Sequence, residues 1–207
     1  MKKKWLIIGT LLLIISITFT IVLTKVDVRP IGPLDSSVGL STINQELTFD
    51  YHNKAYKVSK YLGYIALVIP AVYAFIGLTQ LVKNKSLSKV DRRLYVLAIF
   101  YSIVLATYVL FEKVIINYRP VILDEGLEAS FPSSHTLMSI FFTISAIIIN
   151  KSMFKNKYKF INIGLFILGI SIVALRYVSG VHWFTDIIGS ILISGTLLCY
   201  FKACVNE

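Results

Sequence analysis

Charged residues are scarce in this chain of 207 residues, since Asp, Glu, Lys and Arg together make up only 15% of it. An average globular protein has roughly 25% charged residues and roughly 45–50% apolar ones, whereas 56% of this sequence is hydrophobic. The shortage of charge excludes disordered and coiled-coil proteins. A soluble domain of this size also has too much surface to hide so much apolar side chain. The composition therefore indicates an integral membrane protein.

Cysteine and acidic residues are also few. The only two cysteines, Cys199 and Cys204, lie five residues apart near the C-terminus, so the sequence contains no disulfide framework. Asp and Glu number 11 against 21 Lys and Arg, which gives a formal charge of +10. On a soluble chain such an excess would favour nucleic-acid binding, whereas in a membrane protein it collects in the cytoplasmic loops. The positions of the basic residues decide between the two.

Several stretches are long and apolar enough for a helix that crosses the bilayer, which takes about 20 residues. They are 5–23, 61–82, 94–111, 134–150, 160–175 and 184–201. The first is too long for the core of a signal peptide, and no small-residue cleavage pattern follows it. We therefore expect an all-α fold, a polytopic bundle of six transmembrane helices that forms one integral-membrane domain over residues 1–207.

The Lys and Arg residues are concentrated at one end of this expected bundle. The segments there hold thirteen of the 21 basic residues in about 30 positions, against eight in about 66 at the other end, and cytoplasmic loops carry such an excess. The N- and C-termini are therefore expected in the cytoplasm and the loops 24–60, 112–133 and 176–182 outside. Orientation accounts for the charge, so no nucleic-acid partner is expected. Within the first loop, 47–60 mixes aromatic and charged residues and is predicted to form an interfacial helix.

Ionisable residues near the membrane are costly, so a cluster of them is a functional hypothesis. His182 and Asp186 are four residues apart and would share a helix face. The carboxylate can then accept a hydrogen bond from one ring nitrogen and leave the other as a nucleophile or base. Arg176, across a turn with Gly180, offers a fork of donors suited to phosphate. The alternative interpretation is a helix-capping aspartate beside an interfacial histidine.

A second polar stretch, residues 132–135, opens the fourth span. Ser133 or Ser134 can cap the helix, whose free amides and positive dipole end suit an anion. His135, just inside that turn, can protonate a leaving oxygen. An ordinary capped helix with an incidental histidine is the alternative.

The preceding loop adds two cations, Lys113 and Arg119, which can also be simple interfacial anchors. Together with the two histidines, the aspartate and Arg176, they favour a phosphate site over coincidence. The carboxylates Asp124, Glu125 and Glu128 would suit a metal, but in a turn-forming loop such side chains are more often solvated. No metal is therefore expected.

Three motifs in this order resemble the type 2 phosphatidic acid phosphatase family of integral-membrane lipid phosphatases, which share a core with vanadium haloperoxidases. The family motifs are K-x6-R-P, P-S-G-H and S-R-x5-H-x3-D. Here Arg119-Pro120 matches the end of the first, Pro132-Ser133-Ser134-His135 the second, and Arg176-x5-His182-x3-Asp186 the third. The resemblance covers about residues 60–200 and includes the six-span layout.

The resemblance implies catalysis through a phosphohistidine, without a metal or other cofactor. By it, His182 attacks phosphorus, Asp186 orients His182, and His135 protonates the leaving group. The implied phosphate-binding residues are Lys113, Arg119, Ser133, Ser134 and Arg176.

The sequence departs from the family pattern at three positions. Ser134 stands in place of the motif glycine, and Leu175 in place of the motif serine. Lys113 is six residues before Arg119, where the motif spacing is seven, and Glu112 occupies the seven-back position. Because one residue turns a helix by about 100°, Lys113 joins the site only if a bulge or a non-helical stretch follows it.

The expected activity is hydrolysis of a lipid phosphate or diphosphate at the extracytoplasmic face of the cell membrane, with the lipid tails between the spans. An outward-facing site narrowly favours undecaprenyl diphosphate; phosphatidylglycerophosphate, phosphatidate and lysophosphatidate stay open. A lipid phosphotransferase is the second hypothesis. A non-catalytic binder of lipid phosphates is the third, although it would need cations and not two histidines and an aspartate. The expected partners are the lipid phosphate and the bilayer, and the sequence leaves the oligomeric state open.

Overall fold

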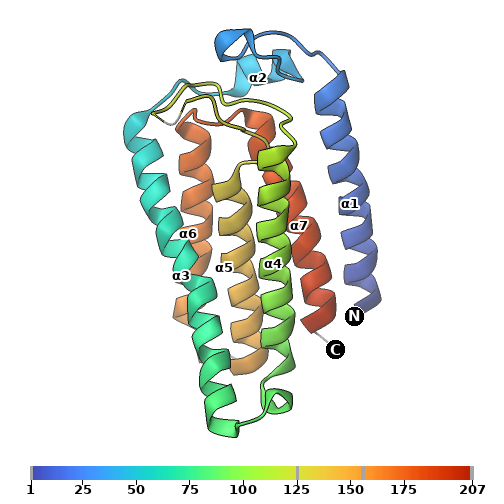
Figure 1. Ribbon diagram of the computed structural model, residues 1–207, viewed down its shortest axis with the longest axis vertical. Helices are drawn as coiled ribbons and strands as arrows, with labels where there is room; N and C mark the ends of the chain where they lie inside the picture. The colour runs from blue at the N-terminus through green and yellow to red at the C-terminus, as the bar shows by residue number, and fades with distance from the viewer. Residues whose placement is uncertain (1, 125, 155–156, 206–207) are drawn as a thin grey trace.

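The computed structural model describes residues 2–124, 126–154 and 157–205, and it is built from long helices (Figure 1). The helices are α1 (Lys2–Lys25), α2 (Ser41–Leu47), α3 (Asn53–Asn84), α4 (Arg92–Lys113), α5 (Ser134–Phe154), α6 (Lys159–Val178) and α7 (Phe184–Val205). All of them except the short α2 are long and apolar enough to cross a membrane, which gives six candidate spans within the described residues. The predicted all-α fold with six spans is confirmed.

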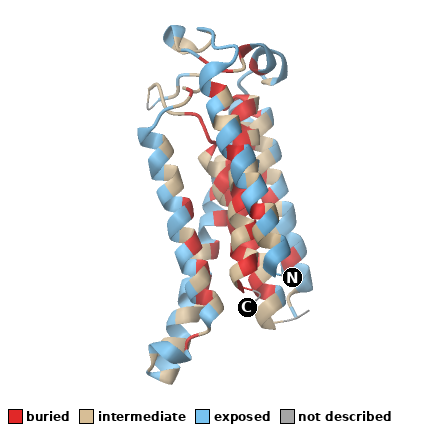
Figure 2. Ribbon diagram, turned by 90° about the vertical axis from the view of Figure 1, so that its right-hand side faces the viewer, coloured by how far each residue is buried: buried red, intermediate tan, exposed pale blue. Residues whose placement is uncertain are grey.

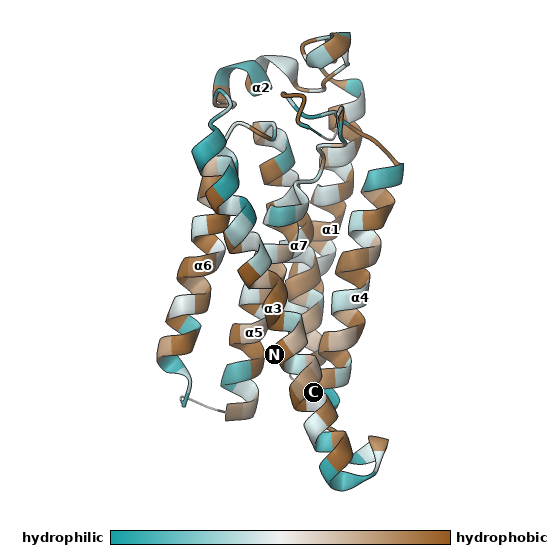
Figure 3. Cartoon of the chain, turned by 60° about the vertical axis from the view of Figure 1, so that its left-hand side comes forward, coloured by the Kyte–Doolittle hydropathy of each residue, from teal (hydrophilic) through white to brown (hydrophobic). Residues whose placement is uncertain are grey.

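Polar caps set the ends of the spans. At the start of α4, the side chain of Asp91 accepts a hydrogen bond from the backbone N–H of Arg93 at 2.9 Å. At the start of α3, the ring of His52 accepts one from the backbone N–H of Ala55 at 3.2 Å. Such acceptors satisfy N–H groups that the first turn of a helix leaves free. Between the caps the helices are mostly apolar, as Figure 3 shows.

Helices α5 and α7 form the interior of the bundle. In their most apolar stretches 50% and 44% of the residues are buried, against 17–22% in the other four spans, and Figure 2 shows buried residues along the middle of the bundle. Phe100 of α4, Phe141 of α5 and Phe201 of α7 meet there, with ring centroids 5.5–6.2 Å apart. Aromatic contacts of this kind hold neighbouring helices at a fixed separation. The start of α5 also carries the second sequence motif, and α7 carries Asp186 of the third.

Both termini lie at one end of the bundle, and α2 and the loops that contain the motifs lie at the other (Figure 1). This arrangement follows from the even number of spans. That the terminal end faces the cytoplasm stays a prediction from the distribution of Lys and Arg.

The predicted interfacial helix over 47–60 is wrong. Leu47 ends α2, and residues from Asn53 onward already belong to α3, so the second span begins earlier than its hydropathy indicates. The reason is that one side of this polar stretch packs against protein. Ser59 is fully buried, and the ring of Tyr56 lies 5.1 Å from the guanidinium carbon of Arg176.

The segment 26–52 folds over the start of α7 and caps it. The hydroxyl oxygen of Thr48 accepts a hydrogen bond from the backbone N–H of Phe184 at 3.0 Å. The side-chain oxygen of Asn44 accepts one from the backbone N–H of Thr185 at 3.1 Å, and its amide donates to the Thr185 hydroxyl at 3.0 Å. Residues distant in sequence therefore satisfy the first turn of α7 and fix the outer segment over the motif-bearing loops.

Candidate active site

The turn between α6 and α7 brings the third motif together. Arg176 lies in the last turn of α6, and His182 and Asp186 follow on either side of the start of α7. Gly180, between them, has φ +62° and lies so close to the outer segment that a Cβ would be 2.2 Å from the carbonyl oxygen of Phe49. A positive φ and this close approach together require glycine.

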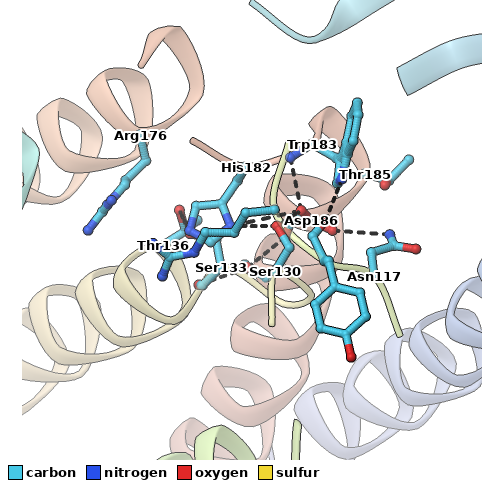
Figure 4. Close-up of polar contacts among 12 residues, drawn as sticks. Asn117, Ser130, Ser133, Thr136, Arg176, His182, Trp183, Thr185 and Asp186 are labelled. Carbon is cyan, nitrogen blue, oxygen red and sulfur yellow. Dashed lines mark hydrogen bonds and ion pairs between the residues drawn. The ribbon is translucent and has the colours of Figure 1, made fainter. Parts of the chain in front are cut away.

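His182 and Asp186 interact through Ser130. His182 Nδ1 is 3.8 Å from Asp186 Oδ2, which is too far for a hydrogen bond. The Ser130 hydroxyl lies 3.1 Å from that nitrogen and 2.5 Å from that oxygen, so it lies between the side chains of His182 and Asp186 (Figure 4). The direct hydrogen bond expected from the four-residue spacing is not formed, because α7 begins at Phe184 and His182 precedes the helix.

The carboxylate of Asp186 is fully buried and surrounded by donors. Its Oδ2 accepts a hydrogen bond from the backbone N–H of Trp183 at 2.9 Å, and its Oδ1 accepts one from the Asn117 amide at 3.4 Å (Figure 4). The indole N–H of Trp183 in turn donates to the carbonyl oxygen of Tyr118 at 2.7 Å. These bonds hold the loop 114–133 against α7 and fix the orientation of the carboxylate.

The environment of His182 favours its neutral form. Burial lowers the pKa of His182 well below its usual value, and the positive charges of Arg119 and Arg176 and the neighbouring His135 lower it further. The Nε2 atom of His182 is buried and has no hydrogen-bond partner among the described residues. A neutral imidazole with an unpaired nitrogen has the properties of a nucleophile or a base.

The two predicted arginines, Arg119 and Arg176, both have unpaired buried donors. Arg119 forms an ion pair with Glu128 at 2.7 Å, yet its Nε has no partner in the described part of the chain. Arg176 is 1% exposed, and both its Nε and its Nη1 are unpaired there. Unpaired buried donors are costly. A phosphate group would supply the acceptor oxygens that these guanidinium groups lack.

The second motif lies beside the arginines at the start of α5. The ring of His135 packs on Gly63 of α3, where a Cβ would lie 2.6 Å from the ring carbon Cδ2. His135 and Ser134 both line a cavity of about 540 Å³ between α3, α4 and α5. Gly63 thus makes the space that the His135 ring occupies.

Ser133 forms hydrogen bonds that hold the start of α5 in place. It is fully buried, and its hydroxyl donates to the Thr136 hydroxyl at 3.0 Å. Its carbonyl oxygen accepts a hydrogen bond from the Ser190 hydroxyl at 3.0 Å, which ties the start of α5 to α7. The predicted role of Ser133 in phosphate binding stays a prediction.

Lys113 lies apart from these residues. It is the last residue of α4, and it is exposed. The expected non-helical stretch does follow it, and a bridge between Tyr118 and Ala129 then brings Arg119 alongside Glu128. Because that stretch begins only after Lys113, it redirects Arg119 and leaves Lys113 at the surface. The structure therefore does not bring Lys113 to the arginines and histidines.

Other residues of the site did not follow from the sequence motifs. Ser130 and Asn117 contact Asp186, and Tyr56 packs on Arg176. Ser130 and Asn117 each lie two residues before a motif residue, and this proximity was the signal that could have revealed them. Tyr56 is separated from the motifs by a whole span and had no such signal. Of the acidic residues considered for a metal, Glu128 pairs with Arg119, and Glu125 lies outside the described residues.

The family model of the PAP2 superfamily matches residues 95–207, a stretch that contains all three motifs. The chain belongs to the PAP2 superfamily. The resemblance expected from the motifs is thereby confirmed, and this PAP2 protein is a multi-pass membrane phosphatase.

A solved structure supports the fold of this PAP2 chain. This chain is similar to the crystal structure of a transmembrane PAP2-type phosphatidylglycerolphosphate phosphatase from Bacillus subtilis, with a TM-score of 0.53 and 21% sequence identity. The similarity covers 78% of this chain and 81% of that one. No curated protein matches the sequence significantly.

Proposed function

We propose that this protein hydrolyses a phosphate or diphosphate ester of a lipid through a phosphohistidine at His182. The observation that carries the proposal is the set of buried, unpaired nitrogens on Arg119, Arg176 and His182. The guanidinium nitrogens are cationic donors for phosphate oxygens, and the Nε2 of His182 offers a lone pair to phosphorus. One phosphate group bound among them would accept hydrogen bonds from both guanidinium groups and place its phosphorus beside Nε2.

The proposed reaction has two balanced steps. His182 Nε2 attacks phosphorus, so that an N–P bond forms while the P–O bond to the leaving group breaks, and the leaving oxygen takes a proton from His135. Water then attacks phosphorus and gives a proton to His135, the N–P bond breaks, and phosphate is released. Throughout, Arg119 and Arg176 stabilise the negative charge on the phosphate oxygens, which is the main electrostatic need of phosphoryl transfer.

The cavity beside His135 supports a lipid as the substrate. Its lining is mostly apolar and comes from the membrane-spanning helices, with Leu67 of α3, Leu105 of α4 and Met138 of α5 among the lining residues. Such a cavity suits an acyl or prenyl tail whose phosphate reaches His135. A soluble phosphate ester would leave this apolar surface unused.

The orientation of the bundle bears on the choice of lipid. The excess of Lys and Arg at the opposite end favours an extracytoplasmic site in the cell membrane. This location narrowly favours undecaprenyl diphosphate, whose hydrolysis recycles the lipid carrier of cell-wall synthesis. Phosphatidylglycerophosphate is the second candidate, because it is the substrate named for the similar Bacillus subtilis structure.

Phosphate release by the purified protein in detergent tests the function. We expect the highest kcat/KM for undecaprenyl diphosphate, followed by phosphatidylglycerophosphate, phosphatidate and lysophosphatidate. Transfer of labelled phosphate to a lipid without free phosphate would indicate a phosphotransferase instead. Binding of lipid phosphates without turnover of any of them would refute an enzymatic function.

Chelation of metals is expected to leave the rate within about twofold of its starting value, since two arginines can take the electrostatic role that a metal has elsewhere. The described residues also contain no group of three or more His, Cys, Asp or Glu side chains placed to hold a metal. The measurement is phosphate release before and after dialysis against EDTA. A strict requirement for added Mg²⁺ would contradict the metal-free mechanism.

A further inference from the structure

The hydrogen bonds around Ser130 define which nitrogen of His182 carries the ring proton. Ser130 has one hydroxyl proton and two polar neighbours, Asp186 Oδ2 at 2.5 Å and His182 Nδ1 at 3.1 Å. A carboxylate oxygen only accepts, and Asp186 already accepts from Trp183 and Asn117. The Ser130 hydroxyl therefore donates to Asp186 and accepts from the Nδ1–H of His182. This leaves the unpaired Nε2 without a proton.

Ser130 is held firmly in this position. It is 1% exposed, and its backbone N–H donates to the carbonyl oxygen of Asn117 at 2.8 Å. The following residue, Phe131, fills the space beside Gly189 of α7, where a Cβ would lie 2.2 Å from the Phe131 ring. The hydroxyl thus has little freedom to leave the space between His182 and Asp186.

We infer that Ser130 is a positioning residue that links Asp186 to His182 and keeps the proton of the His182 ring on Nδ1. The inference rests on the proposed role of His182 as the nucleophile. When the N–P bond forms, the ring becomes positively charged, and the Nδ1–H then donates more strongly to Ser130. Because the Ser130 hydroxyl also donates to Asp186, the negative charge of Asp186 stabilises the positive ring through Ser130. No proton has to leave the ring.

Replacing Ser130 by alanine tests this role. We expect kcat to fall by about 10- to 100-fold, the usual cost of losing the partner that orients a functional histidine, with KM within about twofold because Ser130 does not face the phosphate. A purely structural role would not change the tautomer of His182. The tautomer is measured by ¹⁵N NMR of the ring nitrogens, which is practicable because the chain has three histidines. Ser130→Ala should move the proton toward Nε2, and Ser130→Thr should restore Nδ1–H.

Ser194→Ala is the matched control, because Ser194 is also fully buried and, among the described residues, its hydroxyl binds backbone oxygens of α7. It should leave the tautomer and kcat unchanged. An unaltered tautomer in Ser130→Ala would overturn the inference. Because the tautomer is measured without substrate, this result is separate from a failure of the proposed function, which would show as an active His182→Ala variant.

A different observation concerns a third cation for the phosphate site, the role that the sequence analysis gave to Lys113 beside Arg119 and Arg176. Tyr56, Lys60 and Gly63 of α3 are at positions i, i+4 and i+7 and so share one helix face. Tyr56 packs on Arg176 and Gly63 on His135. Lys60, between them, is half-buried and interacts electrostatically with His135. This face of α3 therefore points at Arg176 and His135.

The geometry points to Lys60 as a phosphate-binding residue that supplies the positive charge expected from Lys113. Lys60→Ala should raise KM for the lipid phosphate by about tenfold, since a hydrogen bond to a charged group is worth about one order of magnitude in affinity or more. Lys60→Arg should restore most of the affinity. Lys54→Ala, an exposed lysine on another face of α3, and Lys113→Ala should each change KM by less than about twofold. An unchanged KM in Lys60→Ala, or a larger effect of Lys113→Ala, would overturn the assignment.

Discussion

Replacing His182 by alanine is expected to abolish turnover, with a loss of kcat/KM of about 10⁴-fold or more, as for other catalytic groups that act as a unit. The ring is buried, and its Nε2 is unpaired beside Arg119 and Arg176. Without this nitrogen the site loses the unpaired lone pair that lies beside the two arginines. The direct measurement is acid-labile, alkali-stable labelling of the protein by a ³²P-lipid phosphate, which should be present in the wild type and absent in His182→Ala.

Asp186→Ala provides a graded comparison for this result. It should reduce kcat less than His182→Ala does, by about 10²- to 10³-fold, because the nucleophile remains and only its orientation is weakened. Different degrees of destabilisation could also make His182→Ala less active than Asp186→Ala. The thermal unfolding midpoint of each variant therefore has to be measured as well. Full activity of His182→Ala, or phosphate labelling of that variant, would end the phosphohistidine mechanism.

Replacing Arg176 by alanine is the second change with a large expected effect, a loss of kcat/KM of about 10³-fold. Arg176 is 1% exposed, and its guanidinium group packs on Tyr56 and has two nitrogens without a partner among the described residues. Removing a preorganised donor from a water-excluded phosphate site costs about 10²- to 10³-fold in rate, and here more than one donor is lost. Arg176→Lys should recover little, because an ammonium group lacks the planar fork that binds two phosphate oxygens.

The control for Arg176 is Arg29, a basic residue of the outer segment. Arg29 pairs with Asp27 at 2.9 Å, and its side chain is 46% exposed. Arg29→Ala should keep activity within about twofold, since exposed ion pairs contribute little. Inhibition by inorganic phosphate is a second measurement. The inhibition should weaken in Arg176→Ala and persist in Arg29→Ala. Retention of phosphate inhibition and of kcat in Arg176→Ala would remove Arg176 from the site.

The spans could be predicted closely because the signal for a transmembrane helix is local. Each of the six predicted stretches lies within one of the long helices, and apart from the start of α3 no end moved by more than four residues. The start of α3 is the exception. There the polar residues before Tyr61 looked like a membrane-surface segment, but Ser59 is buried and Tyr56 packs on Arg176 of α6. Hydropathy cannot distinguish burial against protein from contact with lipid headgroups.

Motif spacing likewise singled out Arg119, His135, Arg176, His182 and Asp186, which the structure places near one another, while their roles in catalysis stay a prediction. The spacing gave a wrong prediction for the contact between two of them. The four-residue spacing of His182 and Asp186 suggests a direct hydrogen bond, and only the position of the start of α7 shows that Ser130 lies between them. The motif resemblance likewise offered Lys113, one residue out of the family spacing, and the end of α4 leaves that residue exposed.

The sequence by itself determined that this is a six-span membrane phosphatase, since the length of an apolar helix is set by the bilayer and the motif residues by the chemistry of phosphate. The tertiary structure alone decided how the site is completed. Ser130 and Asn117 contact Asp186 of α7, and the proposed phosphate-binding residue Lys60 lies on the face of α3 that packs on Arg176 and His135. Each of these positions depends on how segments distant in sequence pack. Packing of this kind is a property of side-chain shape in three dimensions, which no local pattern in the sequence records.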